Sequence, residues 1–169
     1  ACKICGLKND ELSFTKNEYG KPYLTGISQF HFNISHTRNA IAVAVANERI
    51  GIDIECIKTI DFNIARRFFT KKERLFIQGE ADKENETNKR FYEIWTQKEA
   101  YIKFMGKGLS IPLGSFDVTK SSINEIVFCV ETNGYIISVC SLDVRKKSNK
   151  GIVELSEIDL LEMVLVALK

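Results

Sequence analysis

The sequence has no excess of charge of either sign, since 24 Lys and Arg residues face 22 Asp and Glu residues and leave a formal net charge of +2. A balance this close to zero gives no general basic field, so we expect no binding to nucleic acid, and any anion must be held by local cationic clusters. Long apolar runs are also lacking. The longest, near the C-terminus, is interrupted by acids and too short to span a bilayer, so we expect no membrane association.

Several familiar motifs are missing as well. The chain has no Walker phosphate loop, no GxGxxG fingerprint and no GxSxG elbow, and its two histidines give little support for a hydrolytic triad. Of the five cysteines, Cys2 and Cys5 have CxxC spacing, but no second pair completes a zinc site. The odd number and the chain length argue against a disulfide scaffold. No signal-peptide pattern opens the chain, so we expect reduced thiols and a cytoplasmic setting.

What remains is an ordinary globular composition, with 44% hydrophobic and 27% charged residues. The apolar pattern mixes strands and helices without regular alternation, which predicts an α+β fold. Strands are expected over residues 30–35, 41–46, 49–55, 116–118, 125–130 and 135–142. Helices are expected over 62–69, 70–79, 89–105 and from 156 onward, with a helix end before Gly6 and a polar loop over 80–89.

Two acids share one face of the predicted strand 49–55. Side chains alternate along a strand, so Asp53 and Glu55 point the same way, with Cα atoms about 7 Å apart, while Ile52 and Ile54 point the other way. Two carboxylates on an apolar strand repel each other and lose hydration, and a hard cation such as Mg²⁺ offsets both costs. The alternative is an edge strand with one wet, acidic face.

The predicted helix 89–105 places three charged residues beside its apolar stripe. Lys98 falls near the middle of the stripe, so its amine either reaches outward to solvent or meets a buried anion. Glu99 and Lys103 are four residues apart and fit an ordinary helix ion pair. In the functional alternative, Glu99 is a third carboxylate that faces the strand pair, and Lys98 and Lys103 hold a phosphate.

A third polar cluster occupies residues 33–36. Asn33 and Ser35 share the polar face of the predicted strand, and His36 stands at its end. The plain interpretation of a lone histidine is a hydrogen-bonded structural residue, and the spacing by itself favours nothing further.

Taken together, four strings occur in a recognisable order: EYGKPYL (Glu18 to Leu24), FNISHT (Phe32 to Thr37), IGIDIE (Ile50 to Glu55) and WTQKEAYIKFMGKGL (Trp95 to Leu109). In this order they resemble the 4'-phosphopantetheinyl transferases, specifically the type that activates surfactin synthetase. The resemblance covers nearly the whole chain. It implies an α+β fold of two pseudo-symmetric halves, with coenzyme A bound in the cleft between them.

The resemblance implies Mg²⁺-dependent transfer of the phosphopantetheine arm of coenzyme A to a serine of an apo acyl or peptidyl carrier protein, with release of 3',5'-ADP. The implied metal ligands are Asp53, Glu55 and Glu99, and the implied catalytic residues are Asp53, Glu99 and Lys103. Glu99 would be the base for the carrier serine, and Lys103 would steady the pyrophosphate and protonate the leaving group. The implied coenzyme A contacts are Lys21, Pro22, Ser35, His36, Lys98 and Lys103.

The resemblance also implies a division into domains. Residues 1–46 would be the remaining part of the N-terminal half, and residues 47–169 the C-terminal half with the metal site. Members of this type usually have a longer first half, so we expect the first half to be truncated here. Two alternatives are a trimeric holo-acyl-carrier-protein synthase, a type that generally lacks the FNISH segment, and a non-catalytic module that binds coenzyme A or a carrier protein.

Overall fold

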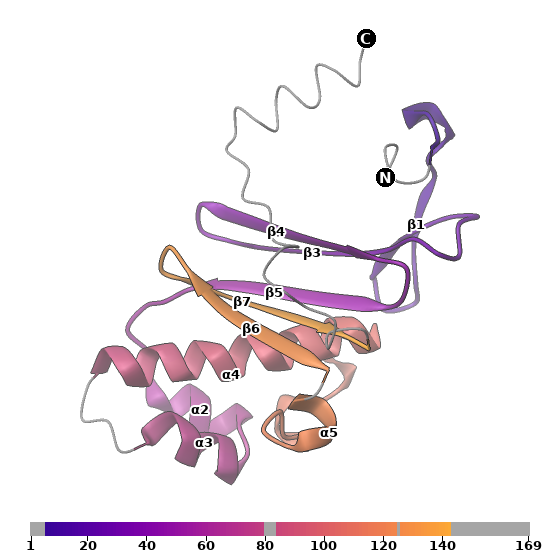
Figure 1. Cartoon of the computed structure of the whole chain (residues 1–169). Coiled ribbons are helices and arrows are strands. Elements are labelled where there is room, and N and C mark those ends of the chain that lie inside the picture. The colour runs from indigo at the N-terminus through magenta and orange to yellow at the C-terminus, as the bar shows by residue number, and fades with distance from the viewer. Residues whose placement is uncertain (1–5, 80–83, 125, 143–169) are drawn as a thin grey trace.

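The computed structural model describes residues 6–79, 84–124 and 126–142 (Figure 1). Its strands are β1 (Phe14–Lys16), β2 (Pro22–Leu24), β3 (His31–Thr37), β4 (Ala40–Ala46), β5 (Ile50–Cys56), β6 (Val127–Thr132) and β7 (Tyr135–Ser141). Its helices are α2 (Phe62–Phe68), α3 (Lys71–Gln78), α4 (Glu84–Met105) and α5 (Ser121–Asn124), with 3₁₀ turns η1 (Asn9–Glu11), η2 (Gly108–Ser110) and η3 (Leu113–Ser115). None of these helices is long and apolar enough to cross a membrane. The predicted α+β mixture of strands and helices is confirmed.

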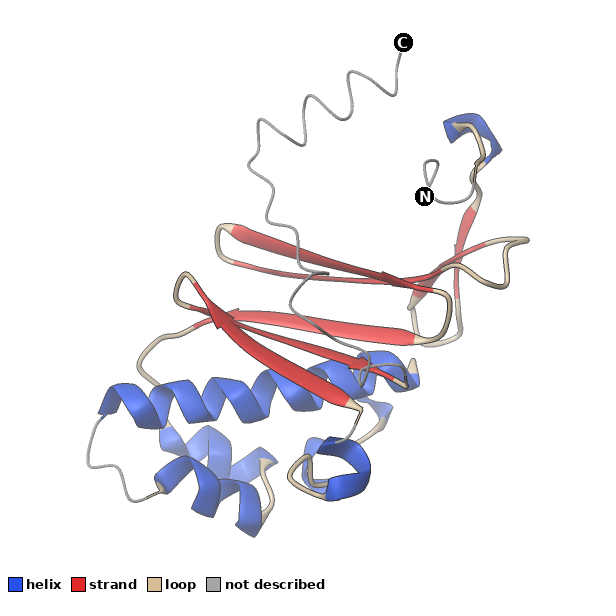
Figure 2. Ribbon diagram, viewed as in Figure 1, coloured by secondary structure: helices blue, strands red, loops and turns tan. Residues whose placement is uncertain are grey.

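The strands form three antiparallel units, of which the β3–β4 hairpin and the three-stranded sheet lie in layers above the helices and the β1–β2 pair lies at one end (Figure 2). β1 pairs with β2, β3 pairs with β4, and the third unit has the strand order β5-β7-β6. β5 is therefore an edge strand of the three-stranded sheet, and β7 lies at its centre. The β3–β4 hairpin covers one face of this sheet and α4 covers the other (Figure 1).

The hairpin packs on the sheet through a strict alternation in β4. Ala42 and Ala44 are buried against Ile52 and Ile54 of β5, and small side chains here let the two layers approach closely. The branched residues between the alanines point away from the sheet and are exposed, namely Ile41, Val43 and Val45. The period-two pattern thus gives β4 one buried and one exposed face, as strand geometry requires.

The other face of β5 meets α4 at Gly51. A Cβ atom at this position would meet the backbone of α4, namely the carbonyl oxygen of Ala100 and the amide nitrogen of Phe104. These are main-chain atoms of a long helix and cannot give way as a flexible side chain can. The absence of a side chain at Gly51 therefore sets the distance between β5 and α4.

Substitution of this glycine tests the close approach. Gly51→Ala should lower the free energy of unfolding by about 3 kcal/mol, because overpacking against backbone forces the helix and strand apart. Gly114→Ala is the matched control, since its added Cβ would meet only the Phe68 carbonyl oxygen at an ordinary 3.7 Å. Urea unfolding of both variants measures the difference, and equal losses would contradict the steric explanation.

The remaining core joins α2 and α3 to α4. Thr70 begins α3 with a capping box, in which its side chain accepts from the Glu73 amide and Glu73 accepts from the Thr70 amide. Gly79 ends the helix as predicted. The buried residues of this cluster are Ala65, Phe69, Ile77, Phe91, Ile94 and Val118.

Two predictions of local structure are wrong. The polar stretch expected as a loop is helical from Glu84 onward, because exposed helix turns tolerate continuous polarity. Residues 116–118 are not a strand but an irregular segment, and their backbone groups bond to the side chains of Lys98 and Glu73 instead of a neighbouring strand. The helix end expected before Gly6 and the final helix expected from 156 onward fall on residues 1–5 and 143–169, outside the described residues.

Candidate active site

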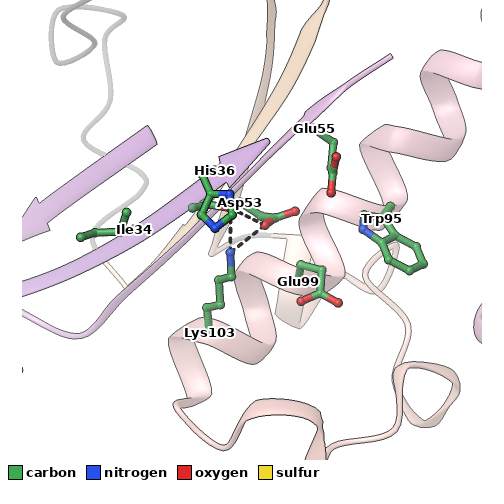
Figure 3. Close-up of a pocket in the computed structure, with 8 residues that line it drawn as sticks. Ile34, His36, Asp53, Glu55, Trp95, Glu99 and Lys103 are labelled. Atoms are coloured by element: carbon green, nitrogen blue, oxygen red, sulfur yellow. Dashed lines mark hydrogen bonds and ion pairs between the residues drawn. The ribbon is translucent and has the colours of Figure 1, made fainter. Parts of the chain in front are cut away.

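A cavity of about 330 Å³ lies where β3, β5 and α4 meet (Figure 3). Its lining contains six of the residues predicted from the sequence to form the site: Ser35, His36, Asp53, Glu55, Glu99 and Lys103. Ile34 and Trp95 complete the lining. Segments far apart in the sequence thus bring three carboxylates, a lysine and a histidine to one place.

β5 presents its two acids to this cavity. Asp53 and Glu55 both line it, while Ile52 and Ile54 are buried on the opposite face of the strand, so the predicted alternation is confirmed. β5 is an edge strand, as the alternative expected, but its acidic face is not openly solvated, because Asp53 is only 5% exposed and Glu55 is partly buried. Its Oδ1 atom accepts hydrogen bonds from the Ser35 hydroxyl at 2.8 Å and from the Lys103 ammonium at 2.7 Å.

β3 lies beside β5 and holds it through side chains. The Asn33 Oδ1 atom accepts from the Ile52 amide at 2.8 Å, and the Ser35 hydroxyl accepts from the Ile54 amide at 3.4 Å. Side-chain oxygens thus take the place that carbonyl groups hold in an ordinary strand ladder. The polar row of β3 therefore fixes the part of β5 that carries the acids.

Thr37 is a site residue that the sequence interpretation missed. Its hydroxyl donates to Glu55 Oε2 at 3.1 Å and so restrains the second acid, as Ser35 restrains the first. The signal was present, because Asn33, Ser35 and Thr37 continue one period-two row along β3.

α4 supplies Glu99 and Lys103 from successive turns of one helix face. The ammonium of Lys103 reaches across the cavity to Asp53 and also donates to the Ser35 hydroxyl at 2.8 Å. The interpretation of Lys103 as the partner in an ordinary helix ion pair is therefore wrong, since its carboxylate partner is on the strand. Glu99 lines the same cavity as the two strand acids, but its carboxylate oxygens point away from Asp53 and Glu55 (Figure 3).

The three carboxylates influence one another electrostatically. Burial raises the pKa of Asp53, and it raises the pKa of Glu55 and Glu99 as well, with the negative charge of Asp53 adding to the rise at both glutamates. The positive charge of Lys103 acts in the opposite direction on all three. The cavity therefore holds more negative charge than its single ammonium compensates.

As placed, these side chains do not yet form a metal centre. Among the residues that the structure describes, no group of three or more His, Cys, Asp or Glu side chains has an arrangement that could hold a metal ion. The Oδ2 atom of Asp53 is nevertheless buried without a hydrogen-bond partner. Such an atom normally has a donor or a cation beside it.

Lys98 does not take part in this cavity. It is fully buried on another face of α4, where its ammonium forms an ion pair with Glu73 at 2.8 Å. Its other two protons go to the carbonyl oxygens of Leu113 at 2.8 Å and Phe116 at 2.7 Å, so none is left for a phosphate. The expected phosphate contact of Lys98 is therefore wrong, and the alternative of a buried anion partner is confirmed.

Lys21 and Pro22 line a neighbouring cavity of about 210 Å³. The Lys21 ammonium donates to the carbonyl oxygens of Ile50 at 2.8 Å and Lys103 at 2.6 Å, which ties the β1–β2 hairpin to β5 and α4. Burial, with the positive charge of Arg49, lowers the pKa of Lys21 to about 8. These two residues therefore lie next to the acidic cavity and not within it.

The sequence profile of the 4'-phosphopantetheinyl transferase superfamily matches residues 49–150, well over half of the chain. The chain belongs to this superfamily, as the four strings predicted.

Curated relatives agree with this assignment. The 4'-phosphopantetheinyl transferase gsp of Aneurinibacillus migulanus is 40% identical over 126 residues, which is 75% of this chain and 52% of the relative. A 4'-phosphopantetheinyl transferase of Bacillus subtilis is 45% identical over 118 residues, 70% of this chain and 52% of the relative. The 4'-phosphopantetheinyl transferase Sfp of Bacillus subtilis strain 168 is 44% identical over 112 residues, which is 66% of this chain and 49% of the relative. The chain spans about half the length of these relatives.

Proposed function

We propose that the protein transfers the 4'-phosphopantetheine arm of coenzyme A to a serine of an apo acyl or peptidyl carrier protein and releases 3',5'-ADP. The observation that carries this proposal is the cavity in which Asp53, Glu55, Glu99 and Lys103 meet. It supports the proposal because catalysis of phosphoryl transfer consists chiefly of positioning and of charge stabilisation around the phosphate. Membership of the superfamily and the names of the curated relatives support it independently.

Mg²⁺ is the proposed cofactor, with Asp53, Glu55 and Glu99 as its ligands. The donor set fits this ion, because Mg²⁺ prefers carboxylate oxygens and the buried Oδ2 atom of Asp53 has no hydrogen-bond donor beside it. The raised pKa values of the three acids fit as well, since they arise first from burial of the carboxylates, to which the charge of Asp53 adds at the two glutamates, and a bound cation offsets both effects. When bound, the ion supplies Lewis-acid polarisation of the phosphoryl group.

Glu99 is proposed as the base that takes the proton from the attacking serine hydroxyl. Burial and the charge of Asp53 raise the pKa of Glu99 toward neutral pH. This higher pKa makes the Glu99 carboxylate a better proton acceptor. Lys103 is proposed to hold the pyrophosphate oxygens and to donate a proton to the leaving phosphate. Both side chains project into the cavity from the same rigid helix.

The remaining coenzyme A contacts are assigned by position. Ser35 and His36 lie at the end of β3 beside the cavity and are proposed to meet the 3'-phosphate. Lys21 and Pro22, in the neighbouring cavity, are proposed to contact the adenine side.

We further propose that the β3–β4 hairpin belongs to the first of two pseudo-symmetric halves, and that residues 47–169 form the second. The separate hydrogen-bond ladders of the hairpin and of the three-stranded sheet support this division. A cytoplasmic location is part of the same proposal, because the reaction takes coenzyme A as its donor and the cysteines are expected to be reduced thiols.

The test is incubation of the chain with coenzyme A, Mg²⁺ and an apo carrier protein, followed by mass spectrometry of the carrier. The expected result is a gain equal to one phosphopantetheinyl group, which is absent when the metal is chelated or when the acceptor serine is replaced by alanine. A panel of acyl and peptidyl carriers that gains no mass would overturn the proposal. Calorimetric binding of coenzyme A without transfer would then identify a non-catalytic binding module.

A further inference from the structure

The ammonium of Lys103 lies beside the Asp53 carboxylate, where a metal ion bound by Asp53 would also have to lie. Its distances are 2.7 Å to Asp53 Oδ1 and 2.8 Å to the Ser35 hydroxyl (Figure 3). The Asp53 side chain is 7% exposed and that of Lys103 27%, so the pair is shielded from water far more than a surface ion pair. A contact of this kind is electrostatically strong.

The other acids of the cavity add to the importance of this contact. Glu55 and Glu99 both feel the charge of Asp53, and Lys103 acts against the repulsion at each of them. The charge of Lys103 thus acts on all three acids, and that of Lys58 adds to it at Glu55. A divalent cation that binds Asp53 has to replace Lys103 in compensating the negative charge of the three acids.

The side chain of Lys103 can leave Asp53 without a movement of the helix. The carbonyl oxygen of Lys103 is fixed by the Lys21 ammonium at 2.6 Å, so the backbone stays in place. The ammonium itself stands at the end of a flexible four-carbon stem, which can swing while the backbone is held. The backbone of Lys103 is therefore held in place, while its ammonium is free to change position.

We propose that Lys103 is an internal counter-ion that competes with the divalent cation for Asp53. The cation then binds well only together with an anionic co-ligand, whose phosphates accept the displaced ammonium. This inference rests on the proposed function, because it takes the pyrophosphate of coenzyme A as that co-ligand. Since coupling between two ligands is reciprocal, the anion should in turn bind better in the presence of the cation.

The test is the affinity of the folded chain for Mn²⁺ alone, measured by electron paramagnetic resonance. Lys103→Met should bind Mn²⁺ about tenfold more tightly than the unmodified chain, because the competing charge at Asp53 is gone. Lys103→Arg, which keeps the charge, should bind as weakly as the unmodified chain. At saturating coenzyme A the difference between Lys103→Met and the unmodified chain should shrink.

Lys58→Met is the matched control. Lys58 is exposed, and its charge acts on Glu55 over a distance, whereas Lys103 bonds directly to Asp53. If the gain in affinity were general electrostatics, Lys58→Met would reproduce it, and this outcome would overturn the inference. Adding Asp53→Asn to Lys103→Met should abolish the gain, which places the ion at this carboxylate.

The outcomes separate this inference from the proposed function. Equal or weaker Mn²⁺ binding by a folded Lys103→Met chain would overturn the competition, even if phosphopantetheinyl transfer to a carrier were observed with the unmodified chain. The tenfold gain without any transfer would support the competition and count against the proposed function. Circular dichroism of each variant confirms that the folded chain is being compared.

Discussion

Replacement of Glu99 by glutamine should lower the rate of phosphopantetheinyl transfer by about 10²–10⁴-fold, the usual contribution of a positioned base. Glutamine keeps the size of the side chain but cannot accept the serine proton. Its neutral amide also removes a negative charge that repels Asp53 and Glu55, so the free energy of unfolding should not fall. Mass-spectrometric transfer rates and urea unfolding of the same samples measure both effects.

Glu93→Gln is the matched control for this substitution. Glu93 lies on the same helix and burial raises its pKa too, but the charges that act on it are those of Lys89, Glu86, Arg90 and Glu131, and it does not line the cavity. Its substitution should leave the transfer rate within about threefold of the unmodified chain. A Glu99→Gln chain that transfers as fast as this control would show that Glu99 is not the base.

Lys98→Met should destabilise the fold by about 3–5 kcal/mol, the usual cost of removing one partner of a buried ion pair. The substitution leaves the Glu73 carboxylate buried without its counter-charge and leaves the carbonyl oxygens of Leu113 and Phe116 without their donor. It also removes a cation that stands 4.3 Å from the centre of the Phe116 ring. Guanidinium unfolding followed by circular dichroism gives the loss.

Lys89→Met is the control on the same helix. Its ion pair with Glu131 is solvent-exposed, with 34% and 43% of the two side chains accessible, so its loss should cost about 0–1 kcal/mol. The double variant Lys98→Met with Glu73→Leu should recover part of the stability, because the unpaired buried charge is then absent as well. Equal losses for the two single lysine substitutions would contradict the structural role of Lys98.

Local periodicity made much of the site predictable. Alternation along β5 places Asp53 and Glu55 on one face, and the helical repeat of α4 places Glu99 and Lys103 on another, because both patterns follow from backbone geometry alone. That these two faces meet in one cavity was an inference from the resemblance. Periodicity says which residues share a face, but it does not say what lies opposite.

Long-range side-chain partners were the part that the sequence could not supply. Lys98 falls in an apolar stripe, and only the fold shows that its partner is Glu73, at the start of a separate helix. The same network explains the wrong strand at 116–118. The backbone of that segment has its hydrogen bonds satisfied by Lys98 and Glu73, so it needs no neighbouring strand despite its apolar residues.

The boundary between the β3–β4 hairpin and the three-stranded sheet is bridged by side chains, because Asn33 and Ser35 accept hydrogen bonds from the β5 backbone. The amides of Ile52 and Ile54 bond to side-chain oxygens there, each such bond contributes about 0.5–1.5 kcal/mol, and Ala42 and Ala44 pack on the same strand. Ser35 lies on the β3 side of this boundary and Asp53 on the β5 side, and a hydrogen bond joins them. The two walls of the acidic cavity therefore belong to separate hydrogen-bond ladders and are joined across the cavity by side chains.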